Sequence, residues 1–360
     1  MNAHHQYYDK ETGQILTERF YRGRLVRFLY SSLREKAPVL FRAVTSARMS
    51  SVIAFWNYDF FLGRRISSPQ NFMRACGIDF EECTDDPASL NSAKKIFERR
   101  IRYWECRPAP GDPRIILSPA DSRILVGSFS NTSLLRIKEK FFDYEEMFGN
   151  YKTSWLDAFR EGDFAVFRLT PDKYHYNHAP VSGRVIDFYE IPGEYHSCHP
   201  EAVISVVTPY SKNKRAVTII DTDVPEGTGA GLVAMIEIAA LMIGGIVQCY
   251  SEDRYKDPRP ISRGMSIRRG MPKSLYRPGS STDVLVFQKD RIRFDQELTR
   301  TLRRGDIESR YSAGFGQNLA ETDVKVRSGI ALAVPEPESR PERKKPGERN
   351  IYSSSGNSVL

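Results

Sequence analysis

The segment of this chain most suited to covalent chemistry is RPGSST, residues 277–282, where two serines precede the strand-like sequence DVLVFQ. A serine hydroxyl in a strained turn of small residues can attack the carbonyl carbon before it and convert the peptide bond into an ester. β-Elimination then cuts the chain, and hydrolysis of the resulting dehydroalanine leaves a pyruvoyl group and ammonia. The attack needs a base for the hydroxyl proton and a third group that orients the base. By itself, the Gly-Ser-Ser-Thr string is more often an ordinary turn.

Candidate bases lie upstream in YHYNHAP, residues 174–180. His175 and His178 are three positions apart beside aromatic residues, and histidine is the side chain best suited to moving protons near neutral pH. His196 and His199 repeat this spacing, so a zinc site is an alternative. Neither pair lies in a predicted helix and a proline follows each pair closely, which weakens that alternative. We therefore expect no metal.

A candidate third group is Asp121 in SPADS, residues 118–122, between two β-prone runs. A turn of small residues can hold one carboxylate rigidly near a reaction centre. Aspartate is also a common turn former that hydrogen-bonds its own backbone, and for this motif alone a plain turn is the favoured interpretation. A catalytic role for Asp121 therefore depends on motifs elsewhere in the chain.

The elements that would position these residues are short β-prone runs broken by Gly and Pro, beginning near Ile115. Two segments, residues 143–149 and 156–163, are typical of brief helical turns between strands. We expect an α+β fold whose β-rich core is built of antiparallel sheets. The expected strands are residues 124–129, 164–169, 185–190, 202–207, 216–221, 232–238, 243–250 and 284–287.

The N-terminal part has a different pattern. Apolar residues recur at helical spacing between arginines over residues 16–61, which predicts basic amphipathic helices, and residues 51–65 place aromatic side chains beside arginines. This composition suits the headgroup boundary of an anionic bilayer. We expect residues 1–89 to form a helical, membrane-associating region; the alternative is that these helices pack on the protein's own core.

The overall composition limits the kinds of partner and compartment that fit this chain. The chain has 360 residues, a formal net charge of +8 and five cysteines without a CxxC pair. These features favour an anionic partner and reduced thiols in a cytoplasmic compartment. No secretory signal or run of apolar residues long enough to span a membrane is evident. Residues 333–360 are rich in Pro, Ser and charge, which predicts a disordered tail.

Taken in order, the motifs resemble those of the phosphatidylserine decarboxylase family over residues 90–295 or so. The resemblance rests on six short motifs whose order and spacing are jointly specific. They are the arginines of residues 97–108, SPADSRI, RLTPDKYHYNHAP, HSCHPEAV, GLVAMIEIAALMIGGI and RRGMPKSLYRPGSSTDVLVF.

The resemblance implies roles for individual residues. Asp121 and His178 match the aspartate and the base of a self-cleavage triad, and Ser281 matches the serine that becomes the pyruvoyl group. His175 would protonate the substrate carbanion or contact the substrate carboxylate. Ser280 stands where the family usually has glycine, so cleavage is expected at Ser280-Ser281, with Gly279-Ser280 as the alternative.

Two further positions depart from the family pattern without removing a triad member. Ser122 stands where the family often has glycine, and Lys214 where an acidic residue is common. Either departure is compatible with an altered substrate.

The resemblance implies a pyruvoyl-dependent decarboxylase that converts phosphatidylserine to phosphatidylethanolamine and carbon dioxide, with no pyridoxal phosphate. The expected core, residues 90–332, would divide into a β chain ending at residue 280 and an α chain starting at residue 281, which stay associated. We expect a peripheral protein on the cytoplasmic face of an anionic membrane, with no nucleic-acid partner; a homo-oligomer remains open. The alternatives are a decarboxylase of a soluble amino acid and a non-catalytic lipid-binding relative.

Overall fold

The main element of the fold is a ten-stranded sheet. The computed structural model describes residues 4–18, 62–130, 143–194, 196–197, 199–205, 209–240, 245–278 and 281–334. Neighbouring strands are antiparallel except for the parallel pair of β1 and β15. In spatial order the strands are β11 (Ser266–Ile267), β7 (Gly183–Ile191), β8 (Arg215–Asp221), β9 (Leu232–Ala239), β13 (Ser281–Phe287), β5 (Asp163–Leu169), β4 (Ser122–Ser128), β15 (Glu321–Val324), β1 (Gln6–Asp9) and β2 (Gln14–Thr17).

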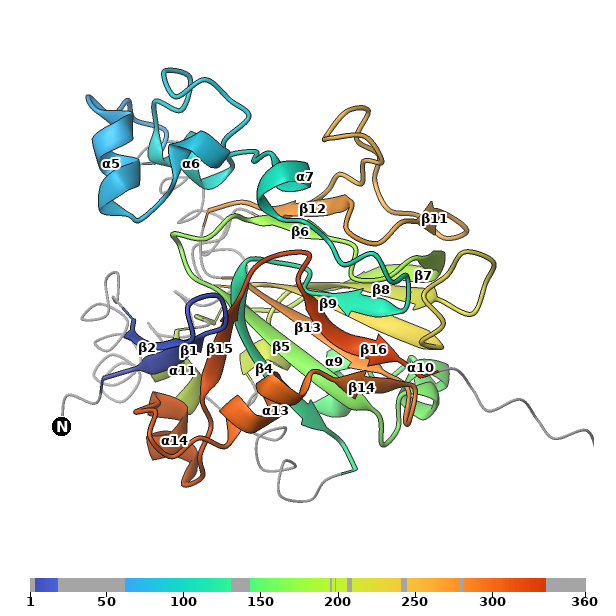
Figure 1. The fold of residues 1–360 in the computed structure, drawn as a ribbon. Coiled ribbons are helices and arrows are strands. Elements are labelled where there is room, and N and C mark those ends of the chain that lie inside the picture. Colours follow the sequence, from blue (N-terminus) through green and yellow to red (C-terminus); the bar gives the residue numbers. More distant parts are fainter. Residues whose placement is uncertain are drawn as a thin grey trace, which may run out of the picture.

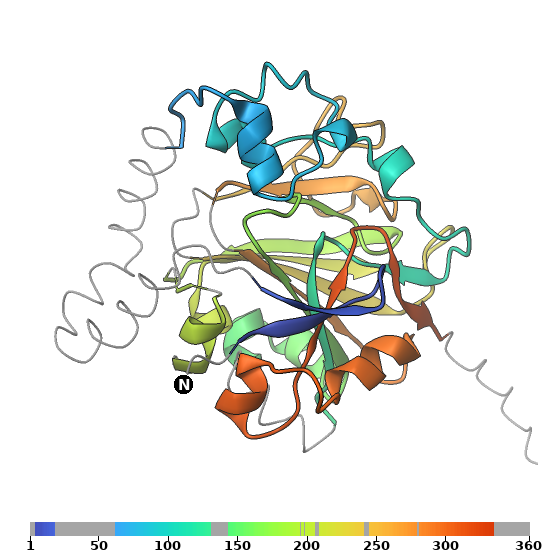
Figure 2. The same cartoon turned by 60° about the vertical axis from the view of Figure 1, so that its left-hand side comes forward.

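Two small antiparallel sheets accompany the large one. The first contains β10 (Ile246–Gln248), β12 (Pro272–Tyr276) and β6 (Tyr176–His178), and the second contains β14 (Ile292–Phe294), β16 (Gly329–Ala333) and β3 (Ile115–Leu117). Figures 1 and 2 show β6 and β12 lying across one face of the large sheet. The sheet β10-β12-β6 therefore forms a second layer.

Short helices flank these layers on two sides (Figure 1). Beyond β6 and β12 lie α5 (Pro69–Ala75), the 3-10 helix η3 (Phe80–Glu82), α6 (Ala93–Phe97) and α7 (Tyr103–Cys106). The remaining helices are α9 (Tyr144–Phe148), α10 (Thr153–Ala158), α11 (Pro200–Ser205), α12 (Pro209–Lys212), α13 (Gln296–Leu302) and α14 (Arg310–Phe315). None of the helices within the described ranges has the length and apolar character needed to cross a bilayer.

The central strands are buried on both faces, which explains their sequences. Every residue of β13, STDVLVF, is buried, and β9, LVAMIEIA, is buried from its second residue onward. A nearly continuous apolar run bounded by turn residues is typical of such a strand. The exceptions, Glu237 in β9 and Asp283 in β13, are therefore charged residue types at positions without access to water.

Most of the expected β core is confirmed, as is the α+β class. The predicted runs at residues 124–129, 164–169, 185–190, 216–221, 232–238 and 284–287 correspond to β4, β5, β7, β8, β9 and β13. The helical turn expected at residues 143–149 corresponds to α9, whereas the one expected at residues 156–163 overlaps only the end of α10 and extends to the first residue of β5. The strand expected at residues 202–207 is wrong, because residues 200–205 form α11. Pro200 at the first position favours a helix there, since its fixed φ angle and missing N–H suit a helix start.

The first residues also differ from the expected helical region. β1 and β2 form a hairpin that turns at Gly13, which has a φ of 71°, and this hairpin joins the edge of the large sheet. Helical character from residue 1 is therefore incorrect for residues 6–17. The amphipathic helices expected within residues 19–61 and the tail expected at residues 335–360 lie outside the described residues.

A buried cluster of charges fastens this hairpin to the sheet. Arg168 on β5 contacts Glu321 of β15 at 2.6 Å and Glu18, just after β2, at 2.8 Å. His5 lies 2.7 Å from Glu321. Burial alone would raise the pKa of Glu18, but Arg168 and Arg123 outweigh it and hold that pKa at about 2. His5, Glu18 and Glu321 have the spacing of metal ligands, yet the arginines already neutralise these carboxylates.

A second buried cluster fastens the small sheet β10-β12-β6 to the large one. The Lys273 ammonium on β12 lies 2.7 Å from Oε2 of Glu237 on β9, and both side chains have no exposed surface. Gln248 on β10 donates to the same oxygen at 2.7 Å, and Asn177 on β6 donates to Oε1 at 3.3 Å. One carboxylate of the large sheet thus binds side chains from all three strands of the small sheet.

Removal of Lys273 tests this attachment. We expect Lys273→Met to lower the free energy of unfolding by about 3–5 kcal/mol, because it leaves Glu237 buried without its counter-ion. Adding Glu237→Gln to the same chain is expected to recover most of the loss. Denaturant unfolding midpoints measure both effects.

Lys289→Met is the matched control, because the Lys289–Glu161 pair is about half exposed, at 53% and 56%. Its effect should stay below about 1 kcal/mol. Equal effects of the two lysine substitutions would contradict the proposed attachment.

Candidate active site

Ser281 opens the central strand β13. It pairs with Leu169 of β5 on one side and Ala239 of β9 on the other, and it has no exposed surface. Its hydroxyl has no hydrogen-bond partner among the residues that the structure describes. Gly279 and Ser280 lie outside those residues. Ser281 is therefore a buried nucleophile candidate whose backbone is fixed by neighbours on both edges.

His178 lies in β6 and is fully buried. Its Nδ1 is 2.8 Å from the carbonyl oxygen of Gly270, and its Nε2 is 2.9 Å from the Tyr174 hydroxyl. Because a carbonyl can only accept, Nδ1 carries the hydrogen and Nε2 accepts from Tyr174. Burial lowers the pKa of His178 to about 3, so the ring is neutral near pH 7. A neutral ring with its lone pair on Nε2 is the form that a base requires.

A chain of hydroxyl groups continues from His178. The Tyr174 hydroxyl lies 2.6 Å from that of Tyr255, and the Tyr255 hydroxyl lies 3.0 Å from the carbonyl oxygen of Ile101. Tyr103 packs edge-on against the His178 ring with centroids 4.8 Å apart. None of these tyrosines was predicted from the sequence to have a role, although the aromatic residues around His178 were a signal that its ring would be enclosed.

Asp121 is held by an arginine. Nε and Nη2 of Arg107 donate to its two carboxylate oxygens at 3.1 and 2.9 Å, and the backbone N–H of Val326 donates at 2.8 Å. Arg107 also binds Glu82 at 2.7 Å. Burial alone would raise the pKa of Asp121, but the charge and hydrogen bonds of Arg107 outweigh it and hold that pKa well below its usual range. Asp121 is therefore ionised.

The structure brings the Asp121 turn and the His178 strand together through the backbone. The His178 N–H donates to the carbonyl of Pro119 at 2.7 Å. Within the described part of the chain, no hydrogen bond joins the Asp121 carboxylate to the His178 ring, whose partners are Gly270 and Tyr174. The two predicted residues thus lie on adjoining segments, and Arg107, rather than the histidine, is the direct partner of Asp121.

His175 immediately precedes β6 and is also buried. Its ring stacks on Phe97 with centroids 3.6 Å apart, and neither ring nitrogen makes a well-formed hydrogen bond to a described residue. Burial, with a smaller contribution from the charge of Arg99, lowers the pKa of His175 well below its usual value. The His175 carbonyl accepts from the N–H of Tyr276, five residues before Ser281. His175 therefore lies beside the segment that leads to the nucleophile.

The histidines of the second pair, His196 and His199, have different surroundings. His196 lies 2.6 Å from Glu194, whereas burial lowers the pKa of His199 to about 3, with Arg168 and Glu18 as the most influential charges. In the described ranges, the histidine, cysteine and carboxylate groups with metal-like spacing are those of His5, Glu18 and Glu321. The zinc alternative for the paired histidines therefore finds no common site there.

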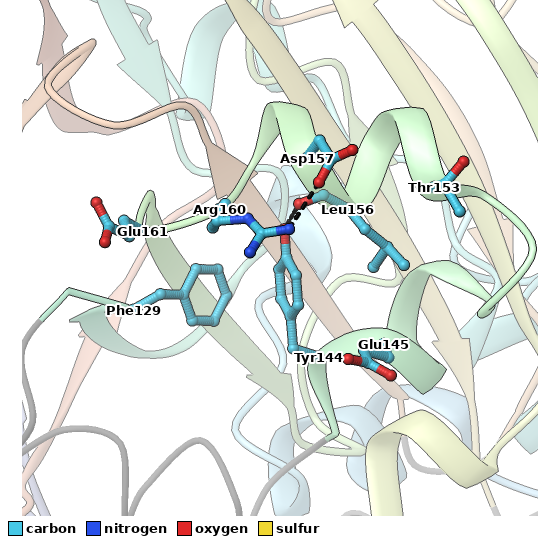
Figure 3. A pocket seen from close by; sticks show the side chains of 8 residues that line it. All are labelled: Phe129, Tyr144, Glu145, Thr153, Leu156, Asp157, Arg160 and Glu161. Atoms are coloured by element: carbon cyan, nitrogen blue, oxygen red, sulfur yellow. Dashed lines mark hydrogen bonds and ion pairs between the residues drawn. The ribbon is translucent and has the colours of Figure 1, made fainter.

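A surface pocket lies at the opposite end of the central strands. Figure 3 shows its lining, in which Tyr144 and Arg160 face Phe129 near the start of β5. Ser281 pairs with Leu169, the last residue of β5, and six residues of strand span roughly 20 Å. This pocket is therefore separate from the buried histidines and serine.

Curated proteins from several bacteria are similar to this chain over most of its length. A phosphatidylserine decarboxylase proenzyme of Fusobacterium nucleatum is 28% identical over 319 residues, which cover 86% of this chain and 95% of the relative. The protein of the same description from Chlamydia trachomatis is 29% identical over 320 residues, covering 88% of this chain and 96% of the relative. The corresponding Ruminiclostridium cellulolyticum protein is 27% identical over 312 residues, covering 86% and 95%.

The profile of one protein family, described as phosphatidylserine decarboxylase, matches residues 93–316. The matched range contains Asp121, His175, His178 and Ser281, as well as the strands that position them. The match extends over more than half of the chain, and this protein belongs to the phosphatidylserine decarboxylase family.

Proposed function

We propose that this chain cuts itself before Ser281 and then decarboxylates phosphatidylserine to phosphatidylethanolamine. The observation that carries the proposal is Ser281, a buried hydroxyl without a partner among the described residues, at the start of a strand fixed on both edges. A neutral buried histidine and an ionised aspartate on adjoining segments support it. Family membership supports the same chemistry.

Cleavage proceeds in three balanced steps. The Ser281 hydroxyl loses its proton to His178 and attacks the carbonyl carbon of Ser280. As the carbon–nitrogen bond breaks, the peptide nitrogen takes that proton from His178 and becomes the free amine of an ester. Removal of the α proton of Ser281 then expels the carboxylate of Ser280 and leaves dehydroalanine. Water converts the corresponding imine into a ketone and releases ammonia. No external oxidant or reductant is needed.

His178 is suited to the first step once its Nε2 exchanges the Tyr174 hydroxyl for that of Ser281. When the ring takes the proton it becomes a cation in a buried site. Burial and the charge of Arg327 oppose that cation, whereas the Gly270 carbonyl and the negative charge of Asp121 favour it. Arg107 keeps the carboxylate ionised and fixed. Asp121 thus acts on His178 through its charge in this structure.

The cut leaves two chains that share one sheet. β13, the first element of the new α chain, stays paired between β9 and β5 of the β chain. β15 of the α chain likewise lies between β4 and β1. The proposed β and α chains therefore remain associated through strand pairing and a common core.

A pyruvoyl group formed from Ser281 supplies a ketone that accepts the electrons released as carbon dioxide leaves. Its position fits this chemistry, because residue 281 is shielded from bulk water and held by strands on both sides. The His175 ring makes no well-formed hydrogen bond to a described residue and lies next to the same segment, and we assign it the return of a proton to the substrate.

Self-cleavage can be tested with substitutions in the three groups. We expect Ser281→Ala, His178→Ala and Asp121→Ala each to remain one uncut band on a denaturing gel, because each removes the nucleophile, its base or the charge that favours the base. Intact-mass spectrometry of the unaltered protein should show a cut before Ser281 and an α chain with an N-terminal pyruvoyl group.

Ser280→Ala distinguishes the two adjacent serines, and it should be cut normally. Ser128→Ala, at the far end of β4, controls for loss of a serine hydroxyl elsewhere. Cleavage of Ser281→Ala together with failure of Ser280→Ala would move the cut to Gly279-Ser280. Normal cleavage in all three triad variants would refute the mechanism.

His175→Ala is expected to separate cleavage from turnover. The precursor should still be cut, whereas kcat for release of carbon dioxide from phosphatidylserine should fall by roughly 100-fold or more, the usual cost of losing a proton-transfer group. Full activity of the cut variant would remove His175 from the reaction. Parallel assays with free serine identify a soluble substrate if carbon dioxide is released from it and none from the lipid.

The expected membrane contact requires a deletion that spares the sheet. Removing residues 1–62 would also remove β1, β2 and the buried Glu18, so residues 20–60 should be replaced by a flexible Gly-Ser linker. We expect the full chain to float with anionic liposomes more strongly than with neutral ones, and the deletion to abolish this difference. Equal flotation of the two proteins would favour packing of this region on the core.

A further inference from the structure

Two carboxyl-bearing side chains share a face of the sheet with Ser281. Ser281 and Asp283 are alternate residues of β13, so their side chains point to the same face, roughly 7 Å apart along the strand. Asp283 pairs with Glu237 across the sheet, and Ser281 pairs with Ala239. Asp283 and Glu237 are both fully buried. The reacting serine therefore adjoins a pair of opposed acids.

Among the residues that the structure describes, one cation, Lys273, is bonded to this pair of acids. Lys273 binds Glu237, which also accepts hydrogen bonds from Ser274 and Gln248. Burial and the charge of Glu237 raise the pKa of Asp283 well above its usual value, whereas Lys273 helps to lower that of Glu237. Burial thus favours the protonated form of Asp283, whereas Lys273 favours the ionised form of Glu237.

The Tyr276 hydroxyl connects Asp283 to the backbone beside Ser281. It lies 2.7 Å from Oδ1 of Asp283 and 3.0 Å from the carbonyl oxygen of Thr282, and it accepts from the N–H of Ile238 at 3.0 Å. A phenol has one hydrogen to donate. When the protonated Asp283 carboxyl donates to the Tyr276 oxygen, the phenol can donate its own hydrogen to the Thr282 carbonyl. The Tyr276 hydroxyl then accepts from Asp283 and Ile238 and donates to Thr282.

The Thr282 carbonyl is the first backbone acceptor after the residue that reacts. Thr282 and Ile238 are partners across β13 and β9, and the Tyr276 hydroxyl bonds to both of them. After cleavage, the N–H of Thr282 carries the group formed from Ser281. An interaction that fixes the Thr282 peptide therefore also limits how that group can rotate.

We propose that Asp283 and Tyr276 form a positioning pair that fixes the Thr282 carbonyl and thereby orients the reactive group at residue 281. The pair rests on the proposed function, because it acts on the cut chain. Neither residue contacts the substrate in this proposal. Asp283 acts through Tyr276, and Tyr276 acts through the backbone.

The test compares three substitutions in purified, fully cut enzyme. Tyr276→Phe removes the bridging hydroxyl, Asp283→Leu removes the donor to it, and Asp283→Asn keeps a neutral donor of the same shape. Because small errors of orientation are costly in catalysis, we expect kcat per cut chain to fall on the order of 10-fold to 100-fold in the first two variants. KM should stay within about 2-fold, and Asp283→Asn should retain most of the activity.

Tyr189→Phe is the matched control, because the Tyr189 hydroxyl donates to the carbonyl of Phe148, away from Ser281. Unfolding midpoints are measured for every variant. The proposal is overturned if Tyr276→Phe and Asp283→Leu keep full kcat, if Asp283→Asn loses as much as Asp283→Leu, or if every loss follows the folded fraction alone.

Cleavage itself supplies a second measurement. A folded Tyr276→Phe or Asp283→Leu chain that stays uncut, while Asp283→Asn is cut, would show the pair acting already in the precursor and would support the proposal. Failure of the unaltered protein to cut or to release carbon dioxide would instead refute the proposed function. Failure of the positioning pair can therefore be distinguished from failure of the proposed function.

Discussion

The pairing of β13 with both β9 and β5 is the constraint on which the rest of the structure depends. A strand bonded along both edges holds its first residue in place whether or not the chain before it is intact. Ser281 occupies that first position. The fold can therefore accommodate a cut before β13 without losing the geometry around residue 281, because the sheet rather than the connecting peptide carries the strand.

The sequence predicted the β core well because buried strands leave a local signal. β9 and β13 are compact apolar runs, and the turn residues around them mark their ends. The prediction failed at residues 202–207, where an apolar run of similar length belongs to a helix that starts at Pro200. A short apolar run does not distinguish the two by periodicity, so the proline was the deciding residue.

The partners of the candidate site residues were harder to predict, because they come from distant segments. Asp121 and His178 were found from local motifs, but the hydrogen bonds to Arg107 and Tyr174 depend on how the segments pack. The sequence shows Glu237 as an acid inside an apolar run, but it does not indicate which residue is its counter-ion. Lys273 lies on another sheet and has no sequence relation to it. Tertiary packing alone pairs such residues.

Burial, together with neighbouring charges, determines the protonation state of each titratable group around residue 281. Burial moves the pKa values of His175, His178 and Asp283 toward the neutral form, whereas Asp121 and Glu237 stay ionised because Arg107 and Lys273 outweigh the cost of desolvation. Each of these two ionised acids is thus bonded to a buried cation. A neutral histidine can still accept a proton and a neutral aspartic acid can still donate a hydrogen bond. The same burial that keeps water from residue 281 therefore sets the protonation states that the proposed chemistry requires.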